Sequence, residues 1–216
     1  MQRTYDLAGR GAAITSIAIR ELTGADYYAA LERAEGPDKR RVTALDVKTE
    51  AIADAIAEVD GAPVARPYPA WAGLGARTGA FIGRAFGDLN ELGDADVLKL
   101  QAAVGPRFDL AALGIDVGIG AVTMREISTQ DELTATAEAA GSKLGRGART
   151  AHFIAAAVTD LDGRRISPAE YLALPVRATQ VLEILYGRVN SASEAELEDF
   201  VKAARATTEP ARGAST

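Results

Sequence analysis

Strand-like and helix-like spacings of apolar residues follow one another in an order that occurs twice along the chain. Each half begins with a segment rich in Ile and Val in partial alternation, which is typical of a strand. Helical spacing follows, and in the second helical segment of each half apolar residues recur at i, i+4 and i+7. The predicted strands cover residues 14–20 and 117–125, and the predicted helices cover 24–35, 45–59, 129–140 and 148–161. We expect each strand to have a partner strand earlier in its half.

Polar residues mark the ends of these helices. Thr23 and Ser128 are suited to cap the helices that follow them, with Asp26 and Asp131 in the first turn, where a negative charge favours the helix dipole. An Asp-Gly pair follows the second helix of each half, at 60–61 and 162–163. We interpret these pairs as turns that end the helices, because glycine adopts the left-handed conformation, and not as metal ligands.

The longest helical pattern runs from an aromatic residue to an asparagine in each half, over 71–90 and 171–190. We expect Asn90 and Asn190 to end these helices, because asparagine tolerates left-handed geometry. Short final helices are predicted over 93–103 and 193–205, the second with a capping box that begins at Ser193. Residues 206–216 have little to bury and are predicted to be disordered.

The two halves align with each other. Residues 5–103 match 108–203 at an offset of 103 at the start, then 105 near residues 20–26, then 102 and finally 100. Chance similarity between two Ala-rich stretches would match alanines, whereas here polar residues also match in order: Arg20/Arg125, Glu21/Glu126, Asp26/Asp131, Asp60/Asp162, Arg77/Arg177 and Asn90/Asn190. The alignment predicts a tandem duplication of a small domain, with copies over 1–105 and 106–205 and a tail over 206–216. The predicted fold class is α+β and mostly helical.

Composition excludes several classes of function. The 216 residues include no Cys and one His, His152, so thiolate metal sites, cysteine nucleophiles and paired-histidine sites are absent. The net charge of −6, from 24 basic and 30 acidic residues, provides no footprint for nucleic acid. No apolar run is long enough to span a membrane. We therefore expect a cytoplasmic protein with no cofactor, no metal and no nucleic-acid or membrane partner.

Arg77 and Arg177 stand out because each lies within an apolar helix face. We expect each to form an ion pair within its own half, with Glu21 or Asp26 and with Glu126 or Asp131; the alternative is contact with an acidic ligand. Neither set includes a nucleophile or a nearby His, so it does not form a catalytic site. The prediction is that the protein is not an enzyme.

Aromatic residues are the candidates for contact with another protein. Tyr27, Tyr28, Trp71 and Tyr171 are of the type enriched at protein interfaces. Core packing is the competing interpretation, and for Trp71 it is the better supported of the two. The sequence leaves open whether both halves bind.

The opening segment of the N-terminal half reads Ile-x-Ile-Arg-Glu-Leu-Thr-x-x-Asp over 17–26. This segment and the order of elements after it, a helix, an Asp-Gly turn, a Leu-x-x-Arg helix and a closing helix, resemble the small tail assembly chaperones of long-tailed bacteriophages and related prophage elements. The resemblance covers residues 12–103 and 117–203. It implies a non-enzymatic protein that coats the helical tape-measure protein and recruits tail-tube subunits, with oligomer formation left open.

Two linked copies would raise the effective concentration of the second site along such a partner. The alternative function is a structural subunit, an adaptor or a tail or baseplate component, that remains in a phage or phage-like particle. An enzyme of unknown type is the third interpretation.

Overall fold

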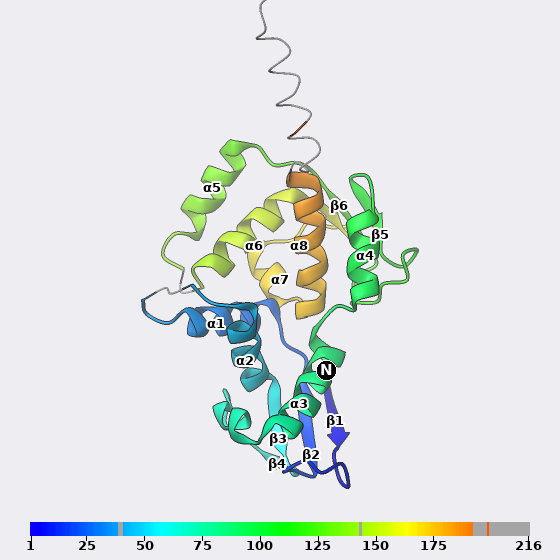
Figure 1. Ribbon diagram of the computed structural model, residues 1–216. Coiled ribbons are helices and arrows are strands. Elements are labelled where there is room, and N and C mark those ends of the chain that lie inside the picture. The colour runs from blue at the N-terminus through cyan, green and yellow to red at the C-terminus, as the bar shows by residue number, and fades with distance from the viewer. Residues whose placement is uncertain (39–40, 143, 192–197, 199–216) are drawn as a thin grey trace, which may run out of the picture.

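The computed structural model describes residues 1–38, 41–142, 144–191 and 198. The fold is α+β and mostly helical, as predicted, with two small antiparallel sheets and helices packed around them (Figure 1). The final helix predicted over 193–205 and the tail predicted over 206–216 lie outside the described residues, apart from Glu198. No helix among the described residues has the length and apolar character needed to cross a membrane.

The N-terminal half contains a four-stranded sheet in the order β1-β2-β3-β4, so that β1 is an edge strand. Its elements are β1 (Gln2–Asp6), β2 (Ser16–Arg20), α1 (Gly24–Glu35), α2 (Ala44–Ala55), β3 (Ile56–Val59), β4 (Ala62–Pro63), the 3-10 helix η1 (Pro69–Gly73), α3 (Ala76–Asn90) and α4 (Asp94–Ala102). The partner strand expected before residues 14–20 is β1, which pairs with β2 in antiparallel register.

The C-terminal half has a similar order of elements around a three-stranded sheet, β5-β6-β7, with no counterpart of β4 or α4 among the described residues. Its elements are β5 (Arg107–Asp109), β6 (Ala121–Met124), α5 (Thr129–Ala139), α6 (Arg146–Ala157), β7 (Val158–Leu161), α7 (Pro168–Ala173) and α8 (Val176–Asn190). The central strand of each sheet has a register shift at aligned positions, after Ala18 and after Thr123. A tandem duplication as the origin of this correspondence stays a prediction.

The helix starts follow the predicted capping chemistry. The hydroxyl oxygens of Thr23 and Ser128 accept hydrogen bonds from the backbone N–H groups of Asp26 and Asp131, at 3.2 and 3.1 Å. Each Asp side chain in turn accepts from the backbone N–H of its capping residue, which completes a capping box in both halves. The predicted caps are therefore confirmed.

The predicted helices over 45–59 and 148–161 were too long. Each ends four residues earlier, and the chain continues directly into a strand, β3 or β7. The helical spacing of apolar residues continues through this strand, but pairing with β2 or β6 determines its conformation.

The Asp-Gly pairs consequently follow strands and do not end helices. They are turns, as predicted, with φ of 51° and 76° at Asp60 and Gly61. The Asp60 carboxylate accepts hydrogen bonds from the backbone N–H groups of Thr15 and Ser16 at 2.6 and 3.0 Å, which ties the turn to the start of β2. In the second half Asp162 accepts from Gly120 and Ala121 in the same way.

The helices predicted over 71–90 and 171–190 are each divided. Trp71 lies in η1 and Tyr171 in α7, whereas α3 begins at Ala76 and α8 at Val176. The residue before each long helix is the cause: Gly75 has φ of 82°, and Pro175 lacks the N–H that a continuous helix requires.

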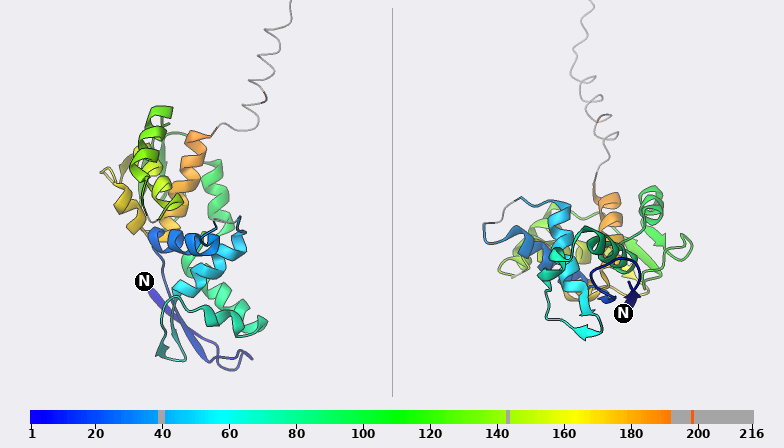
Figure 2. Two further views of the ribbon diagram at one scale, coloured as in Figure 1. Left: turned by 90° about the vertical axis from the view of Figure 1, so that its left-hand side faces the viewer. Right: turned by 60° about the horizontal axis from the view of Figure 1, so that its bottom comes forward.

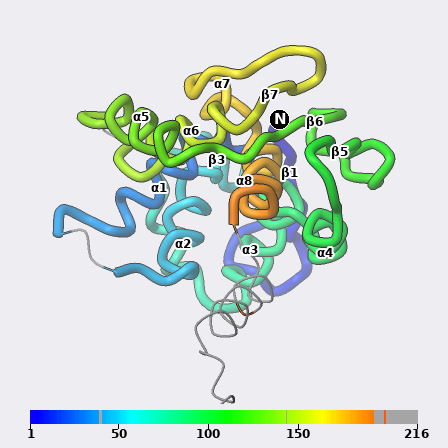
Figure 3. The backbone as a smooth tube through the Cα atoms, turned by 90° about the horizontal axis from the view of Figure 1, so that it is seen from above, coloured from blue at the N-terminus to red at the C-terminus, as the bar shows by residue number. Residues whose placement is uncertain are grey.

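The halves pack closely against each other. Helix α1 contacts α6, α7 and α8, and α4 lies along α8, where Leu100 is fully buried (Figures 1 and 3). The backbone N–H of Gly24 donates to the carbonyl of Leu174 at 3.0 Å, and that of Val176 donates to Leu22 at 2.8 Å. Helix α4 thus precedes the boundary predicted near residue 105 but packs with the C-terminal half (Figure 2).

Candidate functional site

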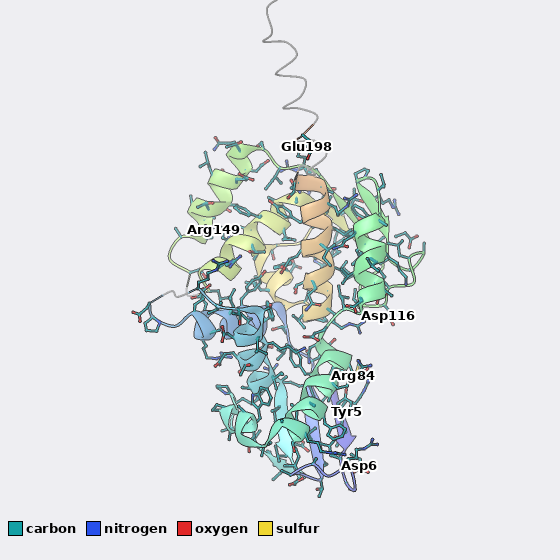
Figure 4. All side chains as sticks on the ribbon, in the orientation of Figure 1. Tyr5, Asp6, Arg84, Asp116, Arg149 and Glu198 are labelled. Carbon is teal, nitrogen blue, oxygen red and sulfur yellow. The ribbon has the colours of Figure 1, made fainter. Side chains whose placement is uncertain are left out.

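An open groove lies between the edge strand β1 and helix α3. It has a volume of about 440 Å³ and is lined by Thr4, Tyr5, Asp6, Leu7, Arg10, Phe81, Arg84, Ala85 and Asp88. Figure 4 shows Tyr5, Asp6 and Arg84 on the same side of the N-terminal half. We refer to this hollow as the β1–α3 groove.

The groove combines an apolar floor with a charged rim. Leu7 and Ala85 are buried beneath it, and Phe81 is half-buried. On the rim, the Asp88 carboxylate accepts hydrogen bonds from the Arg3 guanidinium at 2.5 Å and from the Tyr5 hydroxyl at 2.9 Å. Burial, with the negative charge of Asp88, raises the pKa of Tyr5, so this hydroxyl remains a donor at neutral pH.

The corresponding groove of the C-terminal half, between β5 and α8, is filled. Helix α4 packs along α8 there, and its Leu100, which is 0% exposed, belongs to the same core cluster as Phe108, Leu110 and Leu185. The residues of the β1–α3 groove that align with those three are Tyr5, Leu7 and Ala85. One half therefore buries a helix at a position where the other half, among the described residues, is open.

A second cluster lies where the halves meet. The hydroxyls of Tyr28 and Tyr171 are 3.3 Å apart, and both donate to one carboxylate oxygen of Glu183, at 2.6 and 2.8 Å. Burial, together with the charge of Glu183, raises the pKa of both tyrosines, so both hydroxyls stay protonated. The ring of Tyr28 lies so close to Gly147 that a Cβ there would be 2.4 Å from its Cγ.

The four aromatic residues predicted to bind a partner have different positions. Tyr28 and Tyr171 are brought together and are 4% and 0% exposed, so they join the two halves of this chain. Tyr27 is half-buried and meets Tyr28 edge to face, with ring centroids 5.9 Å apart. Trp71 is half-buried on η1, and its Nε1 has no hydrogen-bond partner in the described part of the chain.

The predicted ion pairs of Arg77 and Arg177 were wrong. Arg77 donates instead to the backbone carbonyl of Arg10 at 2.7 Å, and its guanidinium lies 6.0 Å from the ring centroid of Phe81. Arg177 has a buried Nε without a partner among the described residues.

The acidic residues expected to pair with them lie elsewhere. Arg20 and Arg125, at the strand ends, form ion pairs with Asp26 and Asp131, with N···O distances of 2.8 and 2.9 Å. These pairs form because each strand leads directly into the helix that carries the aspartate. The remaining candidates are Glu21, which is paired with the N-terminal amine at 3.2 Å, and Glu126, which is exposed.

Asn90 and Asn190 end α3 and α8 as predicted, but for another reason. Neither has a positive φ. Each side-chain oxygen accepts a hydrogen bond at 2.7 Å from the backbone N–H that follows the strand and precedes the next helix, of Leu22 and of Ile127. The matching of these polar residues between the halves was the signal of a shared structural role.

Sequence reasoning did not single out the β1–α3 groove. The available signal was a difference between the halves: Arg84 and Ala85 stand where the C-terminal half has Ile184 and Leu185. An apolar helix face in one half, interrupted by a charge and a small residue in the other, indicates a different neighbour at that position.

The described residues include no group of three or more His, Asp or Glu side chains arranged to hold a metal ion. No family model, no curated protein and no solved structure matches the chain.

Proposed function

We propose that this protein is a non-catalytic assembly protein that receives an amphipathic helix in the β1–α3 groove. The observation that carries this proposal is the matching groove between β5 and α8, which buries α4 with Leu100 fully covered. A surface that holds a helix in one half is suited to hold one in the other, because β1 and α3 stand at the positions that β5 and α8 occupy in the C-terminal half.

The lining of the groove defines the chemistry of its partner. Ala85 leaves room for a larger apolar side chain than the one that fits against Leu185. Arg84 and Arg10, both exposed, favour acidic residues on the flanks of the bound helix, whereas Asp88 is already occupied by Arg3 and Tyr5. The expected partner is an amphipathic helix with one large apolar residue and acidic neighbours.

A helix-binding protein made of two duplicated copies and acting in the cytoplasm agrees with the resemblance to phage tail assembly chaperones. In that role the partner would be the tape-measure protein or a tail-tube subunit. The second candidate is a structural subunit of a phage or phage-like particle. The packing of the halves favours this candidate. Helices α1 and α4 of the N-terminal half contact α6, α7 and α8 of the C-terminal half, so the two halves meet through unlike surfaces, as subunits that assemble in series do.

A co-expression pull-down with the products of neighbouring genes tests the proposal. The wild-type chain should retain a long helical protein, and Arg84→Glu should reduce the amount retained about tenfold. Arg149→Glu is the matched control, because Arg149 is exposed on α6, far from the groove in Figure 4. Equal retention by all three chains, or by none, would refute helix binding in the groove.

Mass spectrometry of purified particles separates the two roles. Absence of the chain from finished particles supports a chaperone, and its presence in stoichiometric amount supports a structural subunit.

A further inference from the structure

The two halves contact each other through different faces. The N-terminal half contributes a docking face, made by Gly24 and Tyr28 of α1 and Leu100 of α4. The C-terminal half contributes a receiving face made by Gly147, Tyr171, Thr179, Glu183 and the groove between β5 and α8. Contact between unlike faces leaves one of each without a contact among the described residues: the docking face of the C-terminal half and the receiving face of the N-terminal half.

Exposed apolar residues mark both unused faces. Leu133, at the position of Tyr28, is 61% exposed, and Leu45, at the position of Gly147, is 72% exposed. They are two of the five large hydrophobic residues exposed among the described residues. Isolated apolar residues are common on surfaces, but these two occupy the positions that touch each other in the interface within the chain.

The sizes of the paired residues change in opposite directions. Within the chain, a large Tyr28 meets Gly147, whereas the unused faces offer a smaller Leu133 and a larger Leu45. A second pair behaves alike: Gly24 lies against Thr179, where a Cβ would be 2.9 Å from Cγ2. The unused faces have Thr129 in place of that glycine and Gly79 in place of that threonine, so the two sizes are again exchanged.

Polar groups also change together. The hydroxyl of Tyr28 requires Glu183 as its acceptor, at 2.6 Å. On the unused faces the hydroxyl is missing, because Leu133 replaces the tyrosine, and the carboxylate is missing, because Gly83 replaces the glutamate. Neither change leaves a buried polar group without a partner if the two faces meet.

The β1–α3 groove shows the same exchange of a large and a small residue between the two contacting surfaces. In the chain's own interface Leu100 packs in a groove whose floor includes Leu185. Residue 200, which aligns with Leu100, is Phe, and the floor of the open groove has Ala85 in place of Leu185. Arg84 and Arg10 line the open groove. Acidic residues that could face these arginines lie near Phe200 in the sequence: Glu194, Glu196, Glu198 and Asp199.

From these pairs we infer that the protein associates head to tail with further copies of itself, repeating between chains the contact made within each chain. Helix α5 of one molecule docks through Leu133 on the face that contains Leu45 in the next, and residues 193–205 of the first fill the β1–α3 groove of the second. The inference rests on the proposed function only in that both treat this groove as a helix-receiving surface.

Sedimentation velocity of the full-length chain over a concentration series tests the association. The wild type should form dimers and larger species, and Leu133→Asp and Leu45→Asp should each weaken association at least about a hundredfold. Leu98→Asp is the matched control: this leucine is 65% exposed on α4 and lies on neither face. A wild type that stays monomeric throughout the series, or an equal effect of the control, would overturn the inference.

Mixing the two variants distinguishes a head-to-tail contact from a symmetric one. Each variant retains one intact face, so an equal mixture of Leu133→Asp and Leu45→Asp should form a dimer that does not extend. In a symmetric contact both leucines would belong to one patch, and mixing would restore nothing; that outcome also overturns the inference.

The groove contact has its own pair of variants. Phe200→Asp and Arg84→Glu should each weaken association about tenfold or more, and their mixture should again form a dimer. The pull-down distinguishes failure of this inference from failure of the proposed function. A wild type that is monomeric but retains a helical partner refutes self-association alone, whereas a wild type that associates but retains no helical partner refutes the proposed function alone. Because the neighbour's residues 193–205 and the partner helix would occupy the same groove, Phe200→Asp should raise retention of the partner.

Discussion

Replacement of Asn90 by Ala should lower the free energy of unfolding far more than the same change at Asn190. Asn90 is 1% exposed and makes two hydrogen bonds across the end of β2. Its oxygen accepts from the N–H of Leu22 at 2.7 Å, and its amide donates to the carbonyl of Arg20 at 3.1 Å. Alanine leaves both backbone groups without this partner.

The expected magnitude follows from burial. A buried polar group deprived of its partner costs about 1–3 kcal/mol, so the two groups released by Asn90→Ala should cost about 2–5 kcal/mol together. Asn190 also accepts at 2.7 Å, from Ile127, but its bond to the carbonyl of Arg125 is long, at 3.5 Å, and the side chain is half-buried. Water can replace part of what is lost there, and Asn190→Ala should cost about 1–2 kcal/mol.

Urea unfolding monitored by circular dichroism measures both values, with unchanged m-values as evidence that the same transition is compared. Asn90→Asp is an informative third variant, since it retains the acceptor for Leu22 but directs a carboxylate at the carbonyl of Arg20. Equal destabilisation by the two alanine variants, or a loss below about 1 kcal/mol at Asn90, would refute the argument from buried hydrogen bonds.

Two further predictions concern the interface between the halves and the helix cap. Gly147→Ala should lower the free energy of unfolding by about 1–3 kcal/mol, because the new Cβ would overlap the ring of Tyr28. Gly187→Ala has open space around the new methyl group and should raise the free energy of unfolding by up to about 1 kcal/mol. Equal effects of the two variants in urea unfolding would contradict this prediction. Burial acts to raise the pKa of Asp26, but hydrogen bonds from Arg20 and Thr23 outweigh it and lower this pKa to about 2. Its contribution to stability is therefore present above about pH 4 and lost as the pH falls through about 2. The difference in urea midpoint between wild type and Asp26→Asn should narrow from pH 5 to pH 2, and a constant difference would exclude this linkage.

Local signals predicted much of the fold. Thr23 and Ser128 could be assigned as caps because capping involves only neighbouring residues, and the α+β class followed from the order of spacings. The lengths of α2 and α6 could not be obtained in this way. Ile56 and Val59 continue the helical spacing, and only pairing with β2, far away in the sequence, makes their segment a strand.

The candidate site was less accessible to sequence reasoning. Tyr28 and Tyr171 were identified as residues of interest, but their contact joins positions 143 residues apart, which no local pattern indicates. The β1–α3 groove is defined by the lack of a covering helix in the part of the chain that the structure describes, and no residue type encodes that. Arg77 and Arg177 are each the second residue of their helix, α3 and α8, but alignment of the halves did not reveal that Arg20 and Arg125 form the ion pairs with Asp26 and Asp131.

The different chemistry of the two contacts has a consequence for assembly. Tyr28 fits against Gly147 and would overlap Leu45, so the docking face of an N-terminal half is excluded from the receiving face of another N-terminal half. Leu133 placed against Gly147 would leave a cavity and remove a hydrogen-bond partner of Glu183, so the reverse mismatch is also unfavourable. Each docking face thus has one matching receiving face. Steric overlap in one mismatched pair, and a cavity with a lost hydrogen bond in the other, disfavour the wrong pairings and produce this specificity. Folding within a chain and association between chains then proceed without competing for the same surfaces, and the halves alternate strictly along the series.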